Sequence, residues 1–104
     1  MSQTLIPIKI TSKAAEKIRE IRLEKQIPEE YALRVGMQGG GCGGMSFVLG
    51  FDLPRETDSS FELDGIDVLI EKKDTMYLLG MIVDFIERDG EQGFSFFKES
   101  EVSN

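Results

Sequence analysis

Five of the six residues from Gly39 to Gly44 are glycine, and the sixth, Cys42, is the only cysteine in the chain of 104 residues. Ordering so many glycines costs considerable conformational entropy, which a plain strand connection would avoid. Glycine also reaches positive φ angles, so such a loop can turn backbone amides toward the sulfur, and a nest of amides favours an anion. We therefore take Cys42 as the candidate functional residue, with Gly39, Gly40, Gly41, Gly43 and Gly44 as the loop supporting its thiolate.

Two other interpretations of this loop stay open. The first is a flexible connection in which Cys42 is merely a small residue. The second is a phosphate cradle, but no Lys-Ser or Lys-Thr pair follows the glycines, and the next segment alternates like a strand. The helix N-terminus that binds phosphate is therefore missing from this pattern.

Length and composition predict one soluble domain over residues 1–104, and the membrane, signal-peptide and cysteine patterns described next predict a cytoplasmic location. The net charge is −7 and no basic run occurs, which argues against binding to nucleic acid. No apolar stretch approaches the ~18 residues of a membrane span, and the first residues do not resemble a signal peptide. A lone cysteine makes no internal disulfide, which fits a reducing compartment.

The chain contains no histidine. This excludes a Cys-His nucleophilic pair, a Ser-His-Asp triad and a Cys/His zinc site within one chain. Because no acid–base pair is visible either, we expect a protein that is not an enzyme.

Periodicity predicts one helix followed by strands. Thr11 or Ser12 is a natural N-cap for a helix over residues 12–25, which must end before Pro28. Apolar residues then alternate over 31–37 and 45–53, so the glycine loop joins two strands, expected to be antiparallel.

The rest of the chain also favours short strands. Residues 54–60 are polar and turn-like, and Asp64-Gly65 is a good hairpin turn between strands at 61–63 and 66–70. Further expected elements are a helical turn at 75–79, a strand from residue 81, a turn over 89–93, a strand at 94–97 and a frayed polar tail at 98–104. The predicted fold class is α+β and strand-rich: a small β-sandwich or flattened barrel of about seven short strands, with one N-terminal helix and a short helical turn.

Three further features have both a functional and a structural interpretation. Glu99 and Glu101 could coordinate a hard cation, although an acidic tail is more commonly just solvated. Asp84 could be a catalytic carboxylate, but a buried Asp bonded to the backbone is commoner. The phenylalanines at 94, 96 and 97 indicate core plus an interface patch, because three aromatics in four strand residues cannot all face one way.

Four segments together carry a resemblance to a known family. They are Ala32-Leu33-Arg34-Val35-Gly36, Gly41-Cys42-Gly43-Gly44-Met45-Ser46-Phe47, Val83-Asp84-Phe85 and Gly93-Phe94-Ser95-Phe96. From about Ile10 to Phe96, with closely similar spacing, the chain resembles the A-type iron–sulfur cluster carriers of the HesB-like family. The resemblance implies a HesB-like fold in a dimer or tetramer. It also implies iron or an iron–sulfur cluster bound between subunits and passed to client apoproteins.

The family's cluster chemistry uses three cysteines, of which only the one in the glycine loop has a match here, Cys42. The other two form a Cys-Gly-Cys that the spacing would place just past Asn104, and the chain has no cysteine or histidine in residues 97–104. A [2Fe–2S] or [4Fe–4S] cluster typically takes four cysteine thiolates. One copy of this chain supplies one thiolate, so we expect an incomplete ligand set.

The sequence therefore predicts an iron–sulfur assembly or carrier protein that binds iron or a labile cluster through Cys42. The remaining ligands could come from a second subunit, glutathione or a partner's thiols, and the expected partners are the assembly machinery and client apoproteins. The alternative is a metal-free interaction or thiol-redox module that retains the fold, with Cys42 idle or reversibly oxidised.

Overall fold

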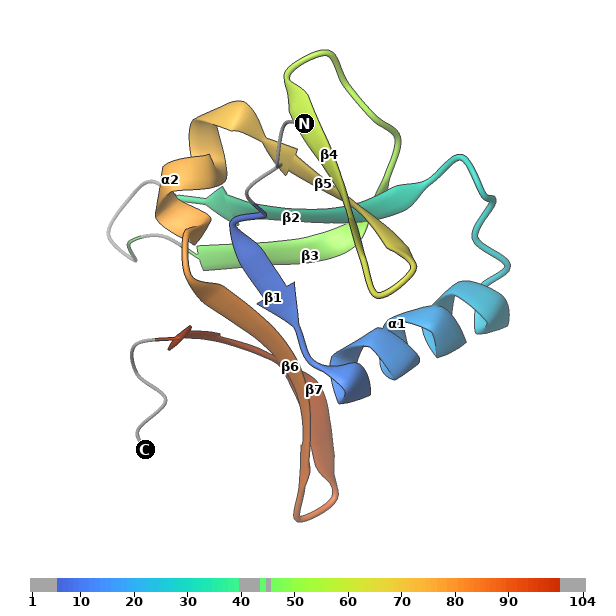
Figure 1. The fold of residues 1–104 in the computed structure, drawn as a ribbon. Coiled ribbons are helices and arrows are strands. Elements are labelled where there is room, and N and C mark those ends of the chain that lie inside the picture. Colours follow the sequence, from blue (N-terminus) through green and yellow to red (C-terminus); the bar gives the residue numbers. More distant parts are fainter. Residues whose placement is uncertain (1–5, 40–43, 45, 100–104) are drawn as a thin grey trace.

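The structure, a computed structural model, describes residues 6–39, 44 and 46–99, which form two sheets and two helices (Figure 1). The strands are β1 (Ile8–Ile10), β2 (Ala32–Gln38), β3 (Ser46–Asp52), β4 (Asp58–Leu63), β5 (Ile66–Glu71), β6 (Met81–Arg88) and β7 (Glu91–Lys98). The helices are α1 (Ser12–Glu24) and α2 (Thr75–Leu78), and a 3₁₀ turn at Lys72–Asp74 leads into α2. The predicted strand-rich α+β fold with one N-terminal helix and a short helical turn is confirmed, and the described strands form two open sheets rather than a closed barrel.

Helix α1 begins where the sequence predicts and ends one residue earlier. The hydroxyl of Thr11 accepts a hydrogen bond from the Ala14 amide at 3.1 Å and so caps the first turn. Ala14 and Ile18 lie on the buried face of the helix. The segment before the helix was not expected to be a strand, but β1 pairs in parallel with β6, with Ile8 opposite Met81.

The four-stranded sheet has the order β3-β2-β5-β4. Strands β2 and β3 are antiparallel over their full length, as predicted. Strands β4 and β5 form the predicted hairpin, and positive φ angles of 52° at Asp64 and 78° at Gly65 make its two-residue turn. The predicted turn over 54–60 is too long: β4 already begins at Asp58, because its polar residues pair with the end of β5, with Asp58 opposite Glu71.

The three-stranded sheet has the order β1-β6-β7. Its hairpin turns at Asp89 and Gly90, whose φ angles are 52° and 83°. The predicted turn over 89–93 is therefore also too long, because residues 91–93 pair with residues 86–88 of β6. Lys98, predicted as the start of a frayed tail, pairs with Met81 and ends β7.

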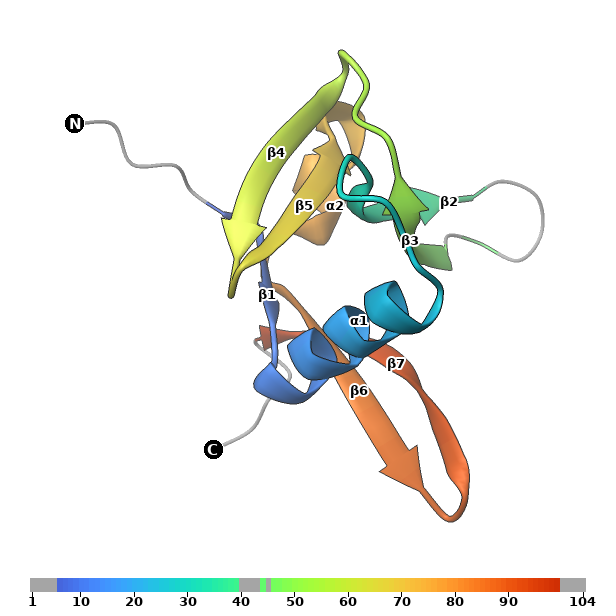
Figure 2. The ribbon, with the colours of Figure 1, turned by 90° about the vertical axis from the view of Figure 1, so that its right-hand side faces the viewer.

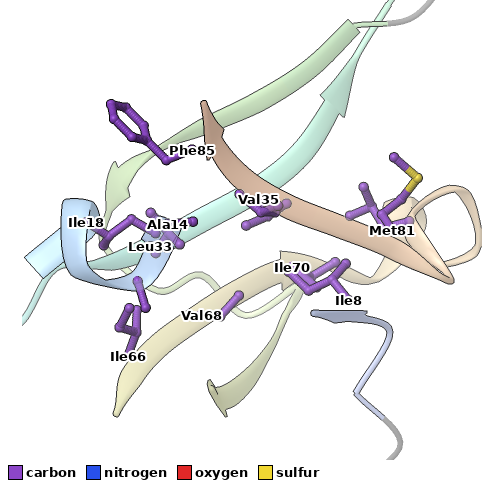
Figure 3. Close-up of a cluster of buried hydrophobic side chains, with 13 residues drawn as sticks. Ile8, Ala14, Ile18, Leu33, Val35, Ile66, Val68, Ile70, Met81 and Phe85 are labelled. Carbon is purple, nitrogen blue, oxygen red and sulfur yellow. The ribbon is translucent and has the colours of Figure 1, made fainter. Parts of the chain in front are cut away.

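One hydrophobic core joins both sheets and α1 (Figure 3). Val35 and Ile70 come from the four-stranded sheet and Met81 from β6, and each is at most 2% exposed. Helix α1 lies beside the three-stranded sheet, below the four-stranded sheet in Figure 2. Burying each such aliphatic side chain contributes about 1.5–3 kcal/mol, so this core is the main source of stability.

A network of ion pairs fixes β2 to the beginning of β4. The Arg34 guanidinium donates two hydrogen bonds of 2.7 Å to the Asp58 carboxylate and a third, from Nε, to Asp52 at 2.7 Å. The Asp58 side chain is 1% exposed. The hydrogen bonds with Asp58, and to a smaller extent the bond with Asp52, raise the pKa of Arg34. The Arg34 guanidinium in turn lowers the pKa of Asp58.

Candidate functional site

The glycine loop connects the end of β2 to the start of β3, and these two strands pair with each other. Gln38, the last residue of β2, lies opposite Ser46, the first residue of β3. Gly44 has a φ angle of +77°, a conformation that favours glycine, and Gly39 and Gly44 are both exposed. The two ends of the loop are thus held side by side by antiparallel pairing.

Several of the predicted site residues lie outside the described residues. These are Cys42 with Gly40, Gly41 and Gly43 in the loop, and Glu101 in the tail. Their predicted roles stay predictions. The structure does establish what surrounds the two strands from which the loop departs.

Asp74 lies against β2 at Met37, which precedes Cys42 by five residues in the sequence. The side chain of Asp74 is 7% exposed, and its Oδ2 accepts a hydrogen bond from the Met37 amide at 3.3 Å. Lys73 Nζ donates to Oδ1 at 3.1 Å, and this hydrogen bond raises the pKa of Lys73. The sequence alone does not single out Asp74, which follows the charged residues Glu71, Lys72 and Lys73 in a segment without a recognisable motif.

An aromatic pair connects the two sheets next to the start of β3. The rings of Phe47 and Phe96 stack with centroids 4.7 Å apart and planes 5° apart. Phe94 meets Phe85 edge-on at 5.0 Å, whereas Phe97 pairs with Ile82 in the β6–β7 ladder. Phe94 and Phe96 therefore pack on the core, as expected for part of this aromatic group.

Two predicted carboxylates have identified partners. Glu99 forms an ion pair of 2.5 Å with Lys9, and its amide donates to the Gly80 carbonyl at 2.7 Å. Asp84 is half-buried and accepts hydrogen bonds from the Thr11 hydroxyl at 2.7 Å and from the Phe85 amide at 2.8 Å. These bonds give Asp84 the structural role that the sequence favoured.

Within residues 6–39, 44 and 46–99, no group of three or more cysteine, histidine, aspartate or glutamate side chains is placed to hold a metal ion. The same residues contain no helix long and apolar enough to cross a membrane.

Comparison with known proteins identifies the family. The model of the iron–sulphur cluster biosynthesis family matches residues 6–102, which is nearly the whole chain. The chain belongs to this family. The resemblance to the A-type carriers is thereby confirmed, together with a role in iron–sulfur cluster assembly as the class of function.

Two relatives and one solved structure are similar to this chain. An uncharacterized protein of Rickettsia prowazekii is 31% identical over 98 residues, covering 93% of this chain and 88% of that protein. The iron–sulfur cluster insertion protein ErpA of Xylella fastidiosa is 39% identical over 82 residues, covering 78% of this chain but 63% of its own length. The crystal structure of SufA of Escherichia coli, a protein involved in biosynthesis of iron–sulfur clusters, superposes with a TM-score of 0.74. It is 28% identical, covering 98% of this chain and 90% of the SufA chain, and it confirms the HesB-like fold.

Proposed function

We propose that this protein is a carrier that takes up iron or an iron–sulfur cluster as cargo through the Cys42 thiolate and passes it to a client apoprotein. The observation that carries the proposal is the family match over residues 6–102, combined with the position of the only cysteine between the paired ends of β2 and β3. Thiolates are the preferred protein ligands of iron–sulfur clusters, and the glycine amides would stabilise the thiolate.

The remaining ligands, in this proposal, come from outside a single chain. A second copy of the chain would contribute its own Cys42, and glutathione or the thiols of a partner would complete the set. Glu99 could contribute only after its ion pair with Lys9 opens. A ligand set shared in this way binds cargo weakly, which suits a protein that must release it.

Two accompanying predictions belong to the same proposal. The protein is not itself an enzyme, because nothing in the carrier chemistry requires it to make or break covalent bonds of a small molecule. It works in the cytoplasm as a homodimer, where a reducing environment keeps Cys42 available as a thiol.

Anaerobic reconstitution tests the proposal. The wild-type protein is incubated with ferrous iron, sulfide and glutathione, desalted, and measured by visible absorbance and by iron and sulfide content. We expect sulfide-to-iron absorption bands in the wild type and their loss in Cys42→Ala, with an unchanged far-ultraviolet circular dichroism spectrum as the control for folding. Identical spectra without such bands in both proteins would reject the proposal and favour the metal-free module.

A further inference from the structure

The edge of β2 that faces β5 is paired over only part of its length. The two strands run parallel with two register pairs, Leu33 with Val68 and Arg34 with Leu69. After Glu71 the chain leaves the sheet through the 3₁₀ turn and α2, which lies beside the end of β2 (Figure 1). Among the described residues, the last part of β2 thus has no strand partner on this edge, although it leads directly into the glycine loop.

The side chain of Asp74 takes the place of a neighbouring strand at this position. Its Oδ2 accepts the hydrogen bond of the Met37 amide at 3.3 Å. Met37 and Asp74 also line a hollow of about 400 Å³, so without this carboxylate the amide would be open to water. A strand amide bonded by a fixed side chain is held in position in the way a ladder partner would hold it.

The residue before Met37 is adapted to this contact. A Cβ built on Gly36 would lie 3.1 Å from Asp74 Oδ2, which is tighter than most Cβ contacts. Gly36 therefore leaves the space that lets the carboxylate approach the strand. Gly36 and Asp74 are therefore sterically complementary, and a substitution of either residue alone would disturb the hydrogen bond between Asp74 and the Met37 amide.

Burying Asp74 is costly for stability, because its carboxylate is nearly excluded from solvent and its counter-ion Lys73 is 67% exposed. A carboxylate in such a place is better explained by the geometry it imposes than by the stability it adds. The element whose geometry it fixes is the end of β2, the strand that precedes the glycine loop in the sequence.

We propose that Asp74 is a positioning residue for Cys42: by holding the Met37 amide, it fixes the exit of β2 and thereby the start of the glycine loop. This rests on the proposed role of Cys42 as the cargo ligand. Asp74 acts through the backbone of β2, and no contact between its carboxylate and the cargo is required.

The test uses the metal-free protein, labelled with ¹⁵N, so that its outcome does not depend on cargo binding. Asp74→Ala removes the acceptor, and Asp74→Asn keeps one carbonyl oxygen while removing the charge. Asp58→Ala is the matched control, because Asp58 is a buried carboxylate that binds Arg34 at the other part of β2. Hydrogen exchange of the Met37 amide and the amide resonances of Gly39 and Cys42 are measured in each variant.

We expect exchange at Met37 to be about tenfold faster in Asp74→Ala, which corresponds to the loss of one ordinary hydrogen bond. The Gly39 and Cys42 resonances should shift or broaden in Asp74→Ala, return toward wild type in Asp74→Asn and stay in place in Asp58→Ala. Gly36→Ala should accelerate exchange at Met37 in the wild type but add little in Asp74→Ala, because both changes remove the same contact.

Exchange at Met37 within twofold of wild type in Asp74→Ala would overturn the hydrogen-bond clamp. Faster exchange with unchanged Cys42 resonances would overturn the positioning role. In a second step, the visible circular dichroism per bound iron should fall in Asp74→Ala but not in Asp58→Ala. If the wild type binds no cargo while the metal-free effects appear, the proposed function fails and the positioning of the loop stands.

Discussion

The ion pairs around Arg34 make a quantitative prediction for Asp58→Asn. The Asp58 side chain is 1% exposed and accepts two hydrogen bonds of 2.7 Å from Arg34 and one of 2.8 Å from the Arg55 amide. Removing one partner of a buried ion pair costs about 3–5 kcal/mol. Because Arg34 keeps its bond to Asp52 and the amide oxygen of Asn replaces one acceptor, we expect the lower limit, a loss of about 3 kcal/mol in the free energy of unfolding near pH 7. For a domain of this size, that loss lowers Tm by about 12 °C.

The loss should depend on pH with a definite sign. Hydrogen bonding with Arg34 holds the pKa of Asp58 below its ordinary value of 3.8. A carboxyl group with a lowered folded-state pKa contributes stability that is fully present above its unfolded-state pKa. This stability is lost as the pH falls through the folded-state pKa. The difference between wild type and Asp58→Asn should therefore be constant from neutral pH down to about pH 5 and shrink at lower pH.

Urea unfolding followed by far-ultraviolet circular dichroism, at about pH 7 and about pH 3, measures both parts of the prediction. Asp67→Asn, an exposed carboxylate on the adjacent strand β5, is the control and should change stability by less than about 0.5 kcal/mol. A loss below about 1 kcal/mol at neutral pH, or a loss equal at both pH values, would refute the reasoning.

Two further variants test the packing of the elements that support the site. Thr11→Ala should lower stability by about 1–2 kcal/mol in thermal unfolding, since it removes both the helix cap and the hydrogen bond to Asp84. Thr11→Ser keeps the hydroxyl and should retain most of the wild-type stability. Equal losses in the two variants would show that the methyl group of Thr11 matters instead. Leu78 is a fully buried residue of α2, and Leu78→Ala should lower the free energy of unfolding in urea by about 2–5 kcal/mol. Met76 is 81% exposed, and Met76→Ala, the control, should lower it by less than about 0.5 kcal/mol. Similar losses in the two variants would contradict the packing of α2 on the core.

Much of the fold follows from local pattern. The N-cap at Thr11, the alternation along β2 and β3 and the Asp64-Gly65 turn are signals read within a few residues, and each corresponds to an element in the structure. Elements defined by distant pairing could not be predicted in this way. Strand β1 has three residues and is a strand because it pairs with β6, and the first residues of β4 are polar and extended because β5 lies beside them.

The residues of the candidate site also differ in whether the local sequence reveals them. Cys42 can be found from the local sequence alone, because a plain connection between strands does not need five glycines around a single thiol. Asp74 cannot, because its sequence neighbours Lys72 and Lys73 suggest a solvated turn, and only the tertiary structure brings its carboxylate to the Met37 amide. The complementarity between Gly36 and Asp74 likewise exists only once β2 and the 3₁₀ turn are packed together.

The most direct test of the central claim is cargo transfer that depends on Cys42. The reconstituted wild-type protein is mixed anaerobically with an apo-ferredoxin, and assembly of the ferredoxin's cluster is followed by visible circular dichroism. A chelator that captures free iron is present throughout. Cys42→Ala, treated identically, is the control. We expect transfer from the wild type that the chelator does not abolish, and no transfer from Cys42→Ala; equal transfer from both proteins would contradict the role of Cys42 as the cargo ligand.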